Sequence, residues 1–237
     1  MITTATILSG VAQGLIWAIL TLGVYLTFRI LDIADLTVEG TFPLGAAVTV
    51  VLINTGMSPA MAMLCALLAG AAAGFITGFL HTIFQIPAIL SGILTMIALY
   101  SVNIRIMSDK ATVALEQPSL KTWMLSLLPE GTVSNTVSII LGTVFCLLIV
   151  ALLYYFFGTE IGCAVRATGS NQNMARSLGV KTDRVIILGL MISNALVAFS
   201  GSLIAQLDYG SALVTMGQGT IVIGLASVII GEVIFGK

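Results

Sequence analysis

The chain has 237 residues, of which 58% are hydrophobic and only 8% are charged, and its formal net charge is -1. Soluble domains average about 25% charged residues, so this composition and a mean hydropathy of +1.13 exclude an ordinary soluble domain. The 9 Lys and Arg residues are balanced by 10 Asp and Glu residues, which leaves no basic footprint for nucleic acid. We therefore expect an all-α, polytopic helical membrane protein in contact with lipid.

Ligating and redox-active side chains are sparse. Cys65, Cys146 and Cys163 are too scattered for a disulfide framework or a metal cluster, and His81 is the one histidine. No metal site and no catalytic residue are predicted. The N-terminus lacks the basic region of a cleavable signal peptide, so we expect the first apolar run to be a retained helix.

About 20 apolar residues cross a bilayer, and the chain divides into about seven apolar runs that span or re-enter it. They cover residues 7–28, 30–53, 61–83, 88–102, 134–156, 185–207 and 220–235. We see no internal repeat and no linker. Residues 1–237 are therefore expected to form a single transmembrane domain.

The second run contains Gly40 and Pro43, which predict a broken helix because both residues destabilise helix interiors. Unwound backbone cannot be satisfied by lipid, so the break should face protein or a water-filled path. Glu39, Gly40 and Gly45 are accordingly candidates to line a translocation path. Glu39 has a second interpretation, as an acid held near Arg29.

Polar residues in the later runs are the other path candidates. Ser193, Asn194 and Ser200 lie within the sixth run, and a mid-span asparagine should face protein or a cavity, where it either lines a path or cross-links helices. Glu232 lies near the end of the last run. It is either a functional acid or a side chain that reaches interfacial water.

Two polar segments interrupt the apolar runs. Residues 105–130 are predicted to be an external loop with a short interfacial helix, acting either as a solvated connector or as a docking face. In residues 157–184, Asn171 can cap a helix over 172–178, which Gly179 can end in the left-handed conformation. This capped helix predicts a docking element for a cytoplasmic partner; the alternative is a basic loop that serves only topology.

The distribution of Lys and Arg predicts the orientation. If residues 157–184 are cytoplasmic, Arg29 and Lys237 are also inside, giving six basic residues inside against three in residues 105–130. The positive-inside rule then places the N-terminus outside.

Two stretches resemble a known family. Residues 158–180 carry Arg166-Ala-Thr-Gly-Ser-Asn followed by Ala175-Arg-Ser-Leu-Gly-Val, similar to the cytoplasmic coupling loop of permease subunits of binding-protein-dependent ABC importers. Within these importers, the pattern looks like the branched-chain amino acid and simple sugar branch. Residues 35–47, Asp35-Leu-Thr-Val-Glu-Gly-Thr-Phe-Pro-Leu-Gly-Ala-Ala, are similar to the second-span signature of that branch.

The resemblance implies a bacterial inner or plasma membrane permease that works with cytoplasmic ABC ATPase subunits, a second permease copy in a homodimer, and an extracytoplasmic substrate-binding protein. The chain has no phosphate-binding loop motif, so ATP and Mg would be bound by the ATPase and no cofactor by this chain. The implied ATPase-coupling residues are Glu160, Arg166, Ala167, Gly169, Asn171, Ala175, Arg176 and Gly179. Family members usually continue with further C-terminal helices, which this chain is expected to lack.

The resemblance leaves the substrate open among amino acids, simple sugars and nucleosides. We favour a hydrophobic or aromatic amino acid, because the second-span segment looks most like members with such substrates. A nucleoside or simple sugar importer is the alternative. A secondary transporter would show inverted repeats and paired discontinuous helices, whereas the sequence suggests only one broken helix.

Overall fold

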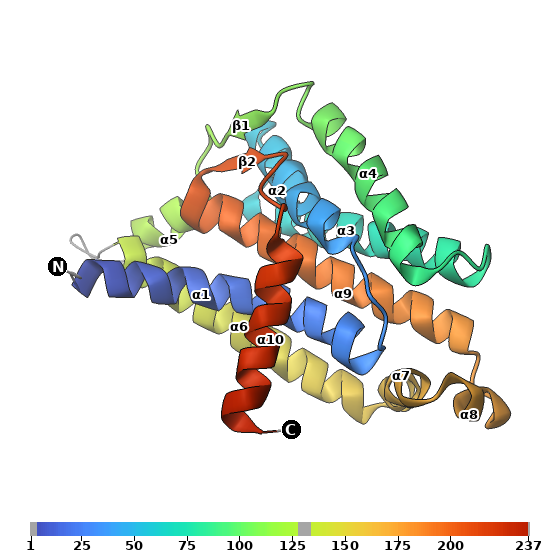
Figure 1. The fold of residues 1–237 in the computed structure, drawn as a ribbon. Helices are drawn as coiled ribbons and strands as arrows, with labels where there is room; N and C mark the ends of the chain where they lie inside the picture. Colours follow the sequence, from blue (N-terminus) through green and yellow to red (C-terminus); the bar gives the residue numbers. More distant parts are fainter. Residues whose placement is uncertain (1–3, 128–133, 237) are drawn as a thin grey trace.

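The computed structural model describes residues 4–127 and 134–236, which contain ten α-helices and two short β-strands (Figure 1). The helices are α1 (Thr4–Tyr25), α2 (Val38–Asn54), α3 (Pro59–Thr82), α4 (Ala88–Ile106), α5 (Leu120–Leu127), α6 (Ser134–Gly158), α7 (Glu160–Ser170), α8 (Gln172–Ser177), α9 (Thr182–Ile204) and α10 (Thr220–Phe235). Single π-helical turns, Leu26–Ile30 and Ala205–Tyr209, continue α1 and α9.

Five of these helical segments are long and apolar enough to cross a membrane. They are Thr6–Ile30, Pro59–Thr82, Ala88–Ile106, Asn135–Gly158 and Thr182–Tyr209. The shorter apolar helices α2 and α10 account for the other two predicted runs. The all-α class is confirmed, with one unpredicted addition: β1 (Thr112–Ala114) pairs antiparallel with β2 (Ser211–Leu213). This pairing ties the predicted loop 105–130 to the segment that follows α9.

Helix α9 is the most buried of the candidate spans, and it packs against α1, α2 and α3 (Figure 1). Small residues on α3 allow a close contact with α9. A Cβ atom at Gly74 would collide with the backbone of Leu190, and one at Gly70 would collide with the carbonyl oxygen of Asn194. Small residues allow membrane helices to approach closely, so the glycines of α3 serve helix packing, as their clustering in the sequence suggests.

The predicted break at Gly40 and Pro43 is wrong, because α2 runs through both residues from Val38 to Asn54. Pro43 removes one backbone N–H and so leaves the Glu39 carbonyl without its usual intrahelical donor. Gly217 packs directly against that carbonyl and the Pro43 ring. The non-helical interruption lies earlier, at residues 31–37; we call these residues the first connector.

The expectation of a single interrupted segment is also wrong. Helix α1, a π-helical turn, the first connector and short α2 follow one another in the same order as α9, a π-helical turn, residues 210–219 and short α10. We call residues 210–219 the second connector. The starts of the two short helices meet, since the Gly219 backbone N–H donates to Glu39 Oε1 over 3.1 Å.

Candidate functional site

Helices α7 and α8 lie together at one end of the molecule, next to the ends of α6 and α9 (Figure 1). The predicted caps of α8 are confirmed. Asn171 Oδ1 accepts from Met174 N over 3.0 Å, and Gly179 is left-handed with φ of 86°. Val180 N donates to Ala175 O over 3.0 Å, the bond that closes a glycine-ended helix.

Helix α7 was not predicted, although its start carries a local signal. Thr159 precedes it, and its Oγ1 accepts from Gly162 N over 3.3 Å, as a capping threonine does. Glu160 is exposed in the first turn of α7, where a carboxylate favours the helix dipole. The polar segment therefore contains a helical pair rather than a single short helix.

The outer surface of this pair combines exposed apolar and basic side chains. Met174 is 49% exposed and Leu178 is 73% exposed, and the cations Arg166 and Lys181 of the same polar segment are also exposed. By contrast, Ala175 is completely buried, so its small side chain seats α8 against the rest of the protein. Ala167 is half-buried on α7.

The two predicted docking arginines already have partners within the chain. Arg176 Nε donates to Thr182 Oγ1 over 2.7 Å, and its guanidinium forms an ion pair with Asp183 over 3.0 Å. Arg166 donates to the Phe157 carbonyl over 3.0 Å. These bonds fasten α8 to the start of α9 and α7 to the end of α6; a contact of either arginine with a partner protein stays a prediction.

Gly169 joins the helical pair to the membrane-embedded part of the chain. A Cβ atom at this position would collide with the carbonyl oxygen of Ile30 and approach Leu31 Cα to 2.9 Å. Val165, one turn earlier, is fully buried in a cluster with Leu26 and Leu31. Helix α7 therefore lies directly on the backbone where α1 passes into the first connector.

The first connector ends in a buried polar cluster. Asp35 is 1% exposed, and its carboxylate accepts from Asn194 Nδ2 over 2.6 Å and from Thr37 N over 2.9 Å. Thr41 Oγ1 donates to Asn194 Oδ1 over 2.9 Å, and the hydroxyls of Thr37 and Thr77 are 2.7 Å apart. One network thus joins the connector to α2, α3 and α9.

Three of the predicted path residues lie in helix contacts. A Cβ atom at Gly45 would collide with the backbone of Ala198, and Ser193 Oγ donates to the Gly23 carbonyl over 2.7 Å. Asn194 is completely buried in the polar cluster. Ser200 similarly donates to the Ile16 carbonyl over 2.9 Å. That Gly45, Ser193 and Asn194 line a translocation path stays a prediction.

Glu39 and Gly40 are placed differently, because both line a cavity of about 310 Å³ between α2, α4 and the second connector. The alternative that pairs Glu39 with Arg29 is wrong, since Arg29 forms an ion pair with Glu232 of α10. That ion pair instead ties the π-helical turn after α1 to the far end of α10.

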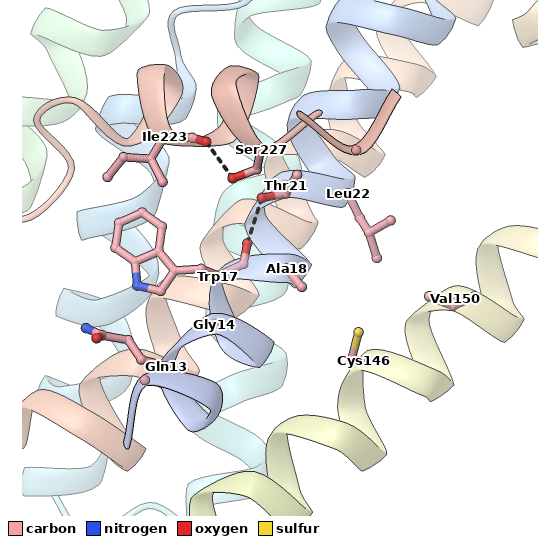
Figure 2. Close-up of a pocket in the computed structure, with 12 residues that line it drawn as sticks. Gln13, Gly14, Trp17, Ala18, Thr21, Leu22, Cys146, Val150, Ile223 and Ser227 are labelled. Atoms are coloured by element: carbon pink, nitrogen blue, oxygen red, sulfur yellow. Dashed lines mark hydrogen bonds between the residues drawn. The ribbon is translucent and has the colours of Figure 1, made fainter. Parts of the chain in front are cut away.

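A larger groove of about 1010 Å³ lies between α1, α6 and α10. Figure 2 shows Trp17 of α1, Cys146 of α6 and Ser227 of α10 along it. Thr21 Oγ1 donates to the Trp17 carbonyl and Ser227 Oγ donates to the Ile223 carbonyl. Because these hydroxyls are satisfied by their own helices, the groove offers a largely apolar wall.

Sequence reasoning missed several residues of these sites. Thr77 stands singly within an apolar stretch, Thr37 lies between Asp35 and Glu39, and Asn103 lies near the end of an apolar run. Gly217 lies in a segment without a helical period. The available signal was Asp35, a carboxylate inside a membrane protein that requires buried donors. The side chain that donates to Asp35, Asn194 of α9, comes from a helix that is distant in sequence.

The fold and these contacts define a multi-pass helical membrane protein with a capped helical pair exposed at one end. Residues 6–236 match the family described as branched-chain amino acid transport system, permease component. The chain therefore belongs to this family of ABC importer permeases, and as a permease it is not itself an enzyme.

Curated relatives agree with this family. The tyrosine transport system permease protein of Clostridioides difficile is 42% identical over 98% of this chain and 74% of its own length. The autoinducer 2 import system permease protein of Photorhabdus laumondii is 28% identical over 97% of this chain and 66% of its own length. The fructose import permease protein of Bifidobacterium longum is 26% identical over 84% of this chain and 59% of its own length. No solved structure matches the chain.

The family also decides between importer and secondary transporter. The sequence argument against a secondary transporter depended on a single broken helix, and the two similar helix arrangements remove that argument. The family match over nearly the whole chain identifies an importer permease without using that argument.

Proposed function

We propose that this chain imports a hydrophobic or aromatic amino acid, driven by a separate cytoplasmic ATPase that docks on α7 and α8 and binds ATP and Mg. The observation that carries the docking proposal is the exposed, doubly capped α8 with Met174 and Leu178 on its surface. A rigid helix with apolar anchors and a basic rim suits a groove with an acidic edge. Glu160, Arg166, Ala167, Asn171 and Gly179 belong to this docking surface.

In this proposal, closure of the ATPase moves α7 and α8 as one body. The contact of Gly169 with Ile30 transmits that movement to the first connector. Asp35 then transmits it to α9 through Asn194, and Asn194 reaches α2 through Thr41. The contact at Gly169 is with backbone, and the hydrogen bonds of Asp35 and Asn194 are buried, so these contacts deform little under load.

The amino acid substrate is supported by the relative named for tyrosine transport, which is more similar to this chain than those named for fructose and autoinducer 2 import. The proposal includes an extracytoplasmic binding protein that delivers the amino acid and a second copy of this chain in the membrane. The test is to purify the chain from native membranes, identify the accompanying proteins and reconstitute the complex in liposomes. ATP-dependent uptake of L-tyrosine or L-leucine supports the proposal. Uptake of fructose alone would show that the substrate is a sugar and not an amino acid.

The proposed orientation places α7 and α8 in the cytoplasm and the strands β1 and β2 outside. We expect a cysteine at Ser170, in a chain whose three own cysteines are alanine, to react only with reagents that cross the membrane. A cysteine at Gln117, exposed near β1, is the matched control and should react from outside. The reverse labelling pattern would show that the orientation in the membrane is opposite to the one proposed.

A further inference from the structure

An unsatisfied buried acceptor lies in the wall of the cavity beside Glu39. Asn103 of α4 is 1% exposed, and its Nδ2 donates to the Gly40 carbonyl over 3.1 Å. That bond orients the amide, because the opposite orientation would place two oxygens together. Among the described residues, Asn103 Oδ1 has no hydrogen-bond partner, and Asn103 lines the cavity. A buried acceptor without a donor is costly and calls for an explanation.

Glu39 adds a carboxylate to the same cavity. Its Oε1 accepts from Gly219 N, and within residues 4–127 and 134–236 no hydrogen bond to its Oε2 is found. The carboxylate lies in the first turn of α2 and at the start of α10, so two helix dipoles stabilise its negative charge. Glu39 thus offers the cavity a charged acceptor that needs no neighbouring cation.

The remaining wall indicates what would bind these acceptors. Glu39 is the one charged side chain among the described residues that line the cavity, and Tyr100 contributes an aromatic ring. Met96 and Pro43 supply apolar surface. A carboxylate, an amide oxygen and an aromatic ring are the groups that bind ammonium, and a volume of about 310 Å³ is at the small end for ligand sites.

We propose that this cavity is a binding site for the protonated primary amine of the transported amino acid, with Glu39 and Asn103 accepting from the ammonium group and Met96 and Pro43 contacting the apolar side chain. This assignment rests on the proposed function and identifies the chemical group that the permease itself recognises. It adds Asn103 and Tyr100 to the site, and the amine requirement distinguishes amino acids from simple sugars.

The test measures protection of a cysteine placed at Met96 in the permease–ATPase complex, in a chain whose own cysteines are alanine. L-tyrosine should slow its reaction with a small thiol reagent, whereas 3-(4-hydroxyphenyl)propionate, which lacks the amine, should not. Glu39→Gln retains the acceptor for Gly219 but loses the charge, so the L-tyrosine concentration needed for protection should rise roughly 10- to 100-fold.

Uptake by the reconstituted complex gives a second readout. Asn103→Leu should raise the KM for L-tyrosine while Ser101→Leu, an exposed change on the same helix, should leave it unchanged. Equal protection by both compounds, or protection unaffected by Glu39→Gln, would overturn the amine site even if the complex imports amino acids. Conversely, protection by tyramine in a complex that imports no amino acid would support the amine-binding site and contradict the proposal that an amino acid is the substrate.

Discussion

Replacing Gly169 with alanine is expected to lower ATP-driven uptake roughly tenfold, which corresponds to a coupling loss of about 1.4 kcal/mol, while the chain still inserts into the membrane. The added Cβ atom would collide with the Ile30 carbonyl and approach Leu31 Cα. Both contacts are with backbone, which cannot move aside as a flexible side chain would. The measurement is the initial uptake rate of the permease–ATPase complex in liposomes, together with the amount of ATPase that remains bound.

Gly158→Ala is the matched control, because a Cβ atom at Gly158 has no heavy atom within 4 Å. It also lies at this end of the molecule, at the end of α6, and should leave uptake unchanged. If Gly169→Ala retained normal uptake, the contact between α7 and Ile30 would not transmit ATPase movement. If the ATPase no longer bound at all, the glycine would serve docking rather than transmission.

Replacing Asn194 with leucine is expected to lower the free energy of unfolding by about 3 kcal/mol. Asn194 Nδ2 is 2.6 Å from Asp35 Oδ2, and Asp35 is buried, so leucine would leave a carboxylate oxygen without this donor inside the protein. Thr41 would lose its acceptor on Asn194 in the same step. The measurement is denaturation of the purified chain in detergent.

A double-mutant cycle separates the hydrogen bond from packing. Asp35→Leu with Asn194→Leu replaces both polar groups by apolar ones, and such paired replacements cost less than removing one partner. The double variant should therefore be more stable than the sum of the two single changes predicts. Additive losses would mean that Asp35 and Asn194 contribute independently and that the polar cluster does not act as a unit.

The two predictions concern neighbouring contacts in the proposed series that runs from α7 through the first connector to α9. Gly169 acts where α7 meets the end of the first π-helical turn, and Asn194 acts where the first connector meets α9. Changing Gly169 should reduce uptake in chains that still insert into the membrane. Changing Asn194 should reduce stability, with uptake falling as folded protein is lost.

The sequence by itself determined the features that depend on local chemistry. Hydropathy placed the seven apolar runs, because a lipid-facing helix must be apolar along its own length. Asn171 and Gly179 predicted both ends of α8, because a cap bonds to backbone only a few residues away. The motifs of residues 158–180 and 35–47 indicated the family that the comparisons confirm.

Only the tertiary structure decided features that depend on distant partners. Gly40 and Pro43 predicted a break by propensity, yet α2 stays helical because Gly217 and Asn103, both remote in sequence, pack against or bond to its carbonyls. The meeting of Glu39 with Gly219 likewise depends on how two short helices are placed in space. Propensity acts over a few residues, whereas burial and hydrogen bonding in a membrane protein are satisfied across helices, so the sites emerge only once the helices are packed.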